Sequence, residues 1–244
     1  VGTPFGLLGA ASILDRETHP HGGILFQGEH QCHNQGTDTI DYTDDDLCGV
    51  RILGVMPNRN RNTYQELANV AGERVRILGE IPVRHRLPDG SPRMDPSGHA
   101  DTSFLVRMPA NVPYLMQGID CDGRTLNTDQ TWQSLRPGEQ KTCGGCHVHS
   151  RATRIVFEES FAATDEYAIP ERGMGSVPLL AGRSDDGTIA TREVSGDGLA
   201  IDFEADVLPI FERRCNDCHG GDAPAAGLAL DRPGTDRDTQ STWF

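Results

Sequence analysis

The sequence predicts a mixed, loop-rich fold, in which a small β-sandwich-like unit is followed by a small helical module. The 244 residues exceed the usual size of one domain, so two compact units are expected. The 28 glycines and 15 prolines indicate short elements joined by many turns. Short β-branched runs fill the first half of the chain, whereas a helical spacing of apolar residues occurs near its end. We therefore expect a His-rich N-terminal segment (1–49), a β-rich middle domain (50–195) and a C-terminal module (196–244).

Short apolar runs separated by Pro, Gly, Asn and Asp predict the strands of the middle domain. Four such runs are present: Val50–Met56, Arg74–His85, Thr102–Met108 and Pro113–Ile119. From 162 to 198 the pattern fades, and we expect an irregular connection with a turn at Ser184–Gly187. Residues 223–244 hold few apolar anchors and predict an extended tail.

A short helix is predicted near the C-terminus. Val207, Ile210 and Phe211 have helical spacing, and Pro209 fits only in a first turn. The helix would deliver the cysteine at position 215, which opens a chemical motif.

Two segments have the pattern Cys-x-x-Cys-His: Cys143–His147 and Cys215–His219. Paired thiols at this spacing add to the two vinyl groups of a haem, and the next imidazole binds the iron. A zinc site or a redox dithiol requires no adjacent His in both copies. The sequence therefore predicts two covalent haem c groups, the second in a cytochrome c-like module. The attachment cysteines are Cys143, Cys146, Cys215 and Cys218, and the proximal iron ligands are His147 and His219.

The first motif follows a Pro137–Gly138 turn without a helical period, so its haem is expected on a loop of the β-rich unit. The opposite face of each iron needs a second ligand, and the other histidines are the candidates. These are His19, His21, His30, His33, His85, His99 and His149. The cluster between His19 and His33 is denser than loops generally need, and His149 lies two residues beyond a proximal ligand.

Three cysteines lie outside the motifs: Cys32, Cys48 and Cys121. The simplest interpretation is a Cys32–Cys48 disulfide, with Cys121 buried and unpaired. The alternative is a third haem held by one thioether at Cys32, with His33 on the iron. Cys48 would then pair with Cys121.

The charge and hydropathy of the chain limit its partners and location. A net charge of −14 argues against nucleic acid and anionic membranes, and no apolar stretch is long enough to span a bilayer. Covalent haem attachment by paired cysteines is normally completed outside the cytoplasm, so we expect an exported, periplasmic or extracellular protein. Val1–Ala11 lacks the features of a signal peptide, so we expect that the signal has already been removed. Other redox proteins or copies of the same chain, in a homo-oligomer or filament, are the expected partners.

Several blocks of the sequence resemble one family. They are Ile77–Val83, Phe104–Ala110, Gln117–Gly123, Leu135–Glu139, Cys143–Ser150 and Val207–Phe211. Together these motifs are similar to the C-terminal haem region of the hydrazine synthase alpha subunit and its uncharacterised multihaem relatives. The resemblance implies an exported β-rich domain followed by a cytochrome c-like domain. It also implies a distal histidine from upstream, which favours His19 or His21.

The sequence departs from this family at one functional position. The resemblance implies a tyrosine on the catalytic iron four residues beyond the motif histidine, and Arg151 stands there. No constellation of catalytic acids and bases is recognisable. The sequence therefore favours electron transfer through bis-His haems over catalysis. The alternatives are a hydrazine-synthase-like haem enzyme, acting on a small nitrogen or oxygen compound at the first haem, and a structural module of a larger complex.

Overall fold

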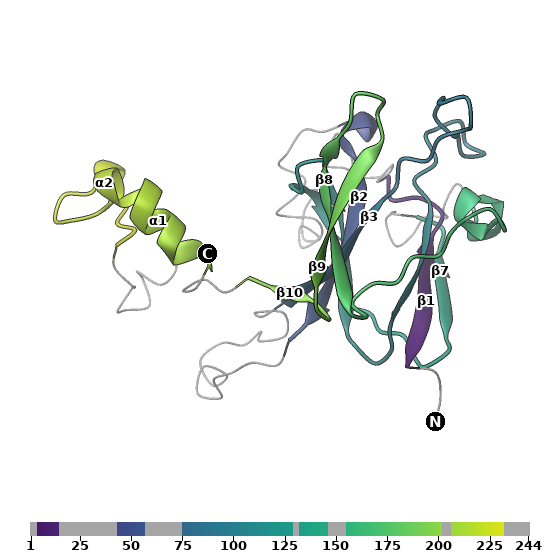
Figure 1. The fold of residues 1–244 in the computed structure, drawn as a ribbon, viewed down its shortest axis with the longest axis horizontal. Helices are drawn as coiled ribbons and strands as arrows, with labels where there is room; N and C mark the ends of the chain where they lie inside the picture. Colours follow the sequence, from purple (N-terminus) through teal and green to yellow (C-terminus); the bar gives the residue numbers. More distant parts are fainter. Residues whose placement is uncertain are drawn as a thin grey trace, which may run out of the picture. The chain divides into compact units, whose positions relative to one another are not determined.

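Two compact units make up the computed structural model of the chain, Val1–Leu199 and Ala200–Phe244. The structure describes residues 4–14, 43–56, 75–128, 132–145, 155–201 and 206–231. Strands dominate the first unit, and short helices dominate the described part of the second (Figure 1). The fold is thus mostly β-sheet with few helices and many loops, as the sequence predicts.

The described strands form three sheets. In the first sheet β1 (Phe5–Ala10) lies between β4 (Phe104–Pro109), antiparallel to it, and β7 (Gln140–Cys143), parallel to it. The second sheet has the order β10-β3-β2-β5-β6. Its strands are β10 (Leu199–Ala200), β3 (Val75–Pro82), β2 (Gly49–Val55), β5 (Tyr114–Ile119) and β6 (Thr125–Thr128). The third sheet is a hairpin of β8 (Ser176–Arg183) and β9 (Ile189–Ser195).

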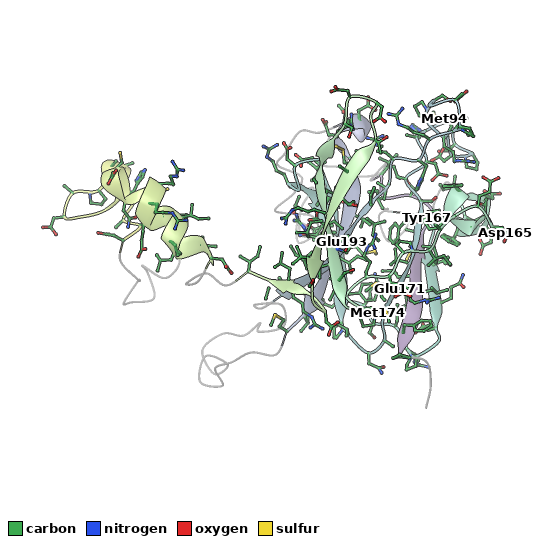
Figure 2. The ribbon with its side chains drawn as sticks, viewed as in Figure 1. Met94, Asp165, Tyr167, Glu171, Met174 and Glu193 are labelled. Carbon is green, nitrogen blue, oxygen red and sulfur yellow. A yellow bond between two sulfur atoms is a disulfide. The ribbon has the colours of Figure 1, made fainter. Side chains whose placement is uncertain are left out.

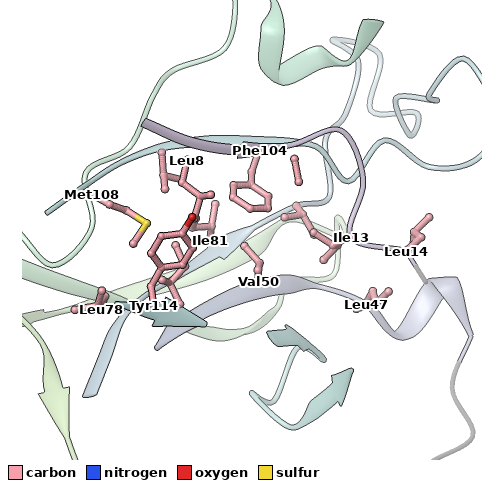
Figure 3. Close-up of a cluster of buried hydrophobic side chains, with 14 of the residues drawn as sticks. Leu8, Ile13, Leu14, Leu47, Val50, Leu78, Ile81, Phe104, Met108 and Tyr114 are labelled. Carbon is pink, nitrogen blue, oxygen red and sulfur yellow. The ribbon is translucent and has the colours of Figure 1, made fainter. Parts of the chain in front are cut away.

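The hydrophobic core lies between the first two sheets (Figure 3). Alternate residues of a strand point to opposite faces of the sheet, so every second residue of a strand faces the core. Leu8, Phe104 and Met108 from one sheet meet Ile52 and Tyr114 from the other, and all five are fully buried. This packing makes the unit sandwich-like.

All four predicted runs form strands: β2, β3, β4 and β5. The connection expected from 162 to 198 is wrong, because most of its second half is the β8–β9 hairpin. The predicted turn is nevertheless present, since Gly187 donates to the carbonyl of Ser184 at 2.8 Å and has a φ of 81°. Pro178 and Gly182 break the alternation of apolar residues that would have revealed β8.

Strand β1 lies within the predicted N-terminal segment, yet it is the central strand of the first sheet. Its sequence, FGLLGA, contains two glycines where a β-branched residue would have signalled a strand. Gly6 and Gly9 are required here: an added Cβ would come within 2.8 Å of the Glu139 carbonyl oxygen or the Phe157 ring. Because close packing on both faces requires glycine at these two positions, β1 lacks the β-branched residues that usually indicate a strand in a sequence.

A disulfide joins Cys48, just before β2, to Cys121, just after β5. The Cys32–Cys48 disulfide is therefore wrong, because Cys48 already has a partner. Strands β2 and β5 are hydrogen-bonded neighbours, with Gly49 opposite Ile119, and this register brings the two cysteines together. Cys32 lies outside the described residues, and the single-thioether haem at Cys32 and His33 remains a prediction.

Candidate haem-binding sites

Only part of the predicted site chemistry falls on described residues. The structure places Cys143 of the first motif and Cys215, Cys218 and His219 of the second. The other predicted site residues lie outside the described ranges: Cys146, His147, His149, His19, His21, Cys32 and His33.

The first motif begins at the end of a strand. Cys143 is the last residue of β7, opposite Ala10 of β1, and its carbonyl accepts a hydrogen bond from Ala11 at 2.8 Å. Its half-buried side chain packs against the main hydrophobic core. The loop predicted for this attachment point is therefore wrong for Cys143. β7 has only four residues and pairs with a strand from the far end of the sequence, so it shows no local periodicity.

The spacer after Cys143 passes close to the chain that follows β1. Gly145 has a φ of 140°, and a Cβ there would lie 3.3 Å from the carbonyl oxygen of Ser12. Ser12 is held in turn, because its hydroxyl lies 3.2 Å from that of Thr102, and the Leu14 amide donates to it at 3.1 Å. These residues fix the path of the chain at Gly145, and sequence reasoning missed them. The apolar residues just before Ser12 were the sequence signal that could have indicated a strand at this place.

His85, one of the candidate iron ligands, is held by contacts within the first unit. Nε2 of His85 lies 2.7 Å from the carbonyl oxygen of Ser103, so this nitrogen carries the proton and donates. Phe161 and Tyr167 meet the His85 ring edge-on, with centroids 4.9 and 5.8 Å away. Burial lowers the pKa of His85, opposed mainly by the hydrogen bond to Ser103. In this arrangement His85 is a half-buried, neutral residue whose ring contacts are structural.

Tyr167 is the first tyrosine after the first motif, and its half-buried side chain lies in the first unit (Figure 2). It packs against the smaller hydrophobic cluster, which contains Ala11, Leu105, Ile155, Phe157 and Ala162. Burial raises the pKa of its phenol. Its contacts therefore account for a structural role.

The second motif is built by two consecutive helices. Helix α1 (Leu208–Arg214) ends where Cys215 donates to the carbonyl of Phe211 at 2.9 Å, and Pro209 lies in its first turn. The predicted helix is thus confirmed. Helix α2 (Asn216–His219) is a single turn, closed by a 2.9 Å hydrogen bond from the His219 amide to the Cys215 carbonyl. Residues three and four apart on a helix face the same side, so the turn groups both thiols with the imidazole.

Further hydrogen bonds close the loop after this motif. The Leu230 amide donates to the carbonyl of His219 at 2.7 Å, and the Gly221 amide donates to a carboxylate oxygen of Asp231 at 2.7 Å. Cys215 and Cys218 have free thiols, and Cys218 is exposed. Both cysteines are therefore available for covalent attachment.

The described part of the second unit has no core of its own. No residue from 206 to 231 is buried, and 48% of Ile210 and 40% of Leu228 are exposed. A segment this small cannot fold on so little apolar burial without a further group. A porphyrin would provide a flat apolar surface against which these exposed apolar side chains could pack. The donor set and the open apolar face therefore fit a covalently bound haem.

The described ranges contain no gathering of three or more His, Cys, Asp or Glu side chains suited to a metal ion. In the same part of the chain, no helix is long and apolar enough to cross a membrane.

The fold and sites define a loop-rich β-sandwich-like protein with a small helical unit that carries a Cys-x-x-Cys-His motif. Comparison with known proteins gives a more particular relation. Residues 48–148 match the family described as hydrazine synthase alpha subunit middle domain. This range contains the whole first motif.

Two relatives agree with that match. The chain is 26% identical over 165 residues to hydrazine synthase subunit alpha of Kuenenia stuttgartiensis, covering 54% of this chain and 20% of that subunit. It also resembles the solved structure of Kuenenia stuttgartiensis hydrazine synthase, with a TM-score of 0.59 and 20% identity. That likeness covers 94% of this chain and 31% of the other. The chain thus spans about a fifth of the curated relative, and a relation to the hydrazine synthase alpha subunit is supported.

Proposed function

We propose that this chain is a haem c protein of the hydrazine-synthase-alpha type, with its reactive centre at the first motif. The observation that carries the proposal is the family match over residues 48–148, which includes Cys143–His147. The relative's name describes an enzyme that makes hydrazine. By this analogy the substrate class is a small nitrogen or oxygen compound.

A haem c at Cys143 and Cys146, with His147 on the iron, would supply redox-active iron. The protein supplies its position. Cys143 is fixed by the pairing of β7 with β1 and by its packing on the core. Ser12, which is tied to Thr102, limits where the chain can pass at Gly145.

The second motif would serve as an electron carrier in this proposal. Cys215 and Cys218 would attach a haem, with His219 as its proximal ligand. The support is the absence of buried residues from 206 to 231 and the one-turn helix that groups these three side chains.

Electron transfer alone is the second candidate function, and one observation favours it. Arg151 stands where the resembled family has a tyrosine that binds the iron. With distal histidines from the set His19, His21, His33 and His149, every iron would be six-coordinate. The comparisons favour the enzyme over this electron-transfer interpretation.

The cellular context completes the proposal. The Cys48–Cys121 disulfide supports export to an oxidising compartment, the periplasm or the exterior. Because the matched relative is one subunit of hydrazine synthase, we expect other protein chains as partners, either redox proteins or copies of this chain. A third haem at Cys32 remains part of the proposal to be tested by mass.

Spectroscopy of the haem-loaded chain separates the two functions. We expect a high-spin fraction that binds carbon monoxide when reduced and cyanide when oxidised. This fraction should vanish in a Cys143→Ala/Cys146→Ala variant and persist in the matched Cys215→Ala/Cys218→Ala variant. If all haems are low-spin and bind neither ligand, electron transfer replaces catalysis. Intact mass gives the number of haems in each variant.

A further inference from the structure

Two buried polar atoms without hydrogen-bond partners lie in the one-turn helix α2. They are Oδ1 of Asn216 and Nδ1 of His219. A buried donor or acceptor left unsatisfied destabilises the fold, so a pair in one helical turn requires an explanation. Neither atom takes part in the attachment of haem through Cys215 and Cys218.

Their chemistry is complementary. When Nε2 of a histidine binds iron, Nδ1 carries the proton and becomes a donor. Oδ1 of an asparagine is an acceptor. Asn216 and His219 are three residues apart, so their side chains project from the same side of the turn.

We propose that Asn216 is a positioning residue that accepts a hydrogen bond from Nδ1 of His219 when a haem is attached at Cys215 and Cys218. This inference rests on the haem at the second motif that is proposed above. Histidines that bind a metal are commonly oriented through their other ring nitrogen, and such a bond makes the imidazole a stronger electron donor. Asn216 thereby fixes the ring orientation of His219 and lowers the reduction potential of this haem.

The backbone holds this arrangement in place. The His219 amide bonds to the Cys215 carbonyl, and the Leu230 amide bonds to the His219 carbonyl. Both backbone groups of His219 are thus occupied, and only the ring can still be oriented. Asn216 is itself half-buried, whereas its neighbour Asp217 is exposed to solvent.

The test compares substitutions in the haem-loaded full chain. Asn216→Leu keeps the size of the side chain and removes the acceptor, so it should raise the reduction potential of one haem. Asn216→Asp provides a stronger acceptor and should lower that potential. The double variant Asn216→Asp/Asp217→Asn is the matched control for charge, because it keeps the net charge and moves the carboxylate by one residue. It should still lower the potential relative to the unsubstituted chain.

A spectroscopic signature separates positioning from a general structural role. Nuclear magnetic resonance in water should show the Nδ1 proton of His219, and Asn216→Leu should speed its exchange with solvent about tenfold, as expected for loss of one ordinary hydrogen bond. Unchanged potential and exchange in Asn216→Leu would overturn the inference. So would a charge-matched double variant with the potential of the unsubstituted chain. A peptide containing Cys215–His219 without haem mass would instead refute the proposed function.

Discussion

Replacing both Cys48 and Cys121 by alanine should destabilise the first unit strongly. The disulfide spans a sequence separation of 73 residues. Constraining a loop of that length removes about 15 cal/mol/K from the entropy of the unfolded chain, which corresponds to about 4 kcal/mol at 25 °C. Cys48 is only 1% exposed, so its replacement also removes packed sulfur from the interior.

Urea unfolding followed by circular dichroism measures this loss in the haem-loaded chain. The slope of the free energy of unfolding against urea should also increase, because the unfolded chain expands without the cross-link. A loss below about 1 kcal/mol in the double variant would show that the reasoning is wrong.

Two further predictions concern buried polar groups. Glu80→Gln should lower the free energy of unfolding by about 2–3 kcal/mol, because the Glu80 side chain is buried and only 3% exposed. Its carboxylate accepts hydrogen bonds from Nε of Arg51 at 2.8 Å and from the Leu180 amide at 2.7 Å. Glu171→Gln, at an exposed ion pair of 2.7 Å, should cost under about 1 kcal/mol, and equal losses in urea unfolding would contradict the role given to burial. Burial lowers the pKa of His85 in the folded state, so the unfolded state binds a proton more readily than the folded state does. The stabilisation that follows from the neutral ring is therefore present above about pH 6.5 and is lost as the pH falls through the folded pKa. His85→Gln should therefore weaken the acid dependence of the unfolding free energy between about pH 7.5 and pH 5, and an unchanged dependence would exclude His85 as its source.

The local features of the chain could be predicted from sequence because their causes are local. Helix α1 depends on apolar residues three and four apart and on the conformation of Pro209. The turn at Ser184–Gly187 depends on a glycine that can adopt positive φ. Strands β2 to β5 carry enough β-branched residues to show in the sequence. Each of these signals lies within a short stretch of chain.

The disulfide partner of Cys48 could not be predicted, because it depends on which strands become neighbours. Cys32 is close to Cys48 in sequence, and a bond between them would close the acidic loop, which made this pair the simplest interpretation. The antiparallel pairing of β2 with β5 reverses this preference by placing Cys121 beside Cys48. Core packing supplies the free energy that offsets the longer loop.

The sequence by itself contains the two Cys-x-x-Cys-His motifs, which predict haem attachment, and it determined the helix before the second motif, because residue type and local spacing are sufficient for that helix. Only the tertiary structure decided that Cys143 ends a strand, that β1 is the centre of a sheet and that the His85 ring donates to the carbonyl of Ser103. Each of these depends on contacts between distant parts of the chain, such as Ala10 with Cys143 or His85 with Phe161. Such contacts form only when strands pair and bury apolar surface together, so no short segment encodes them.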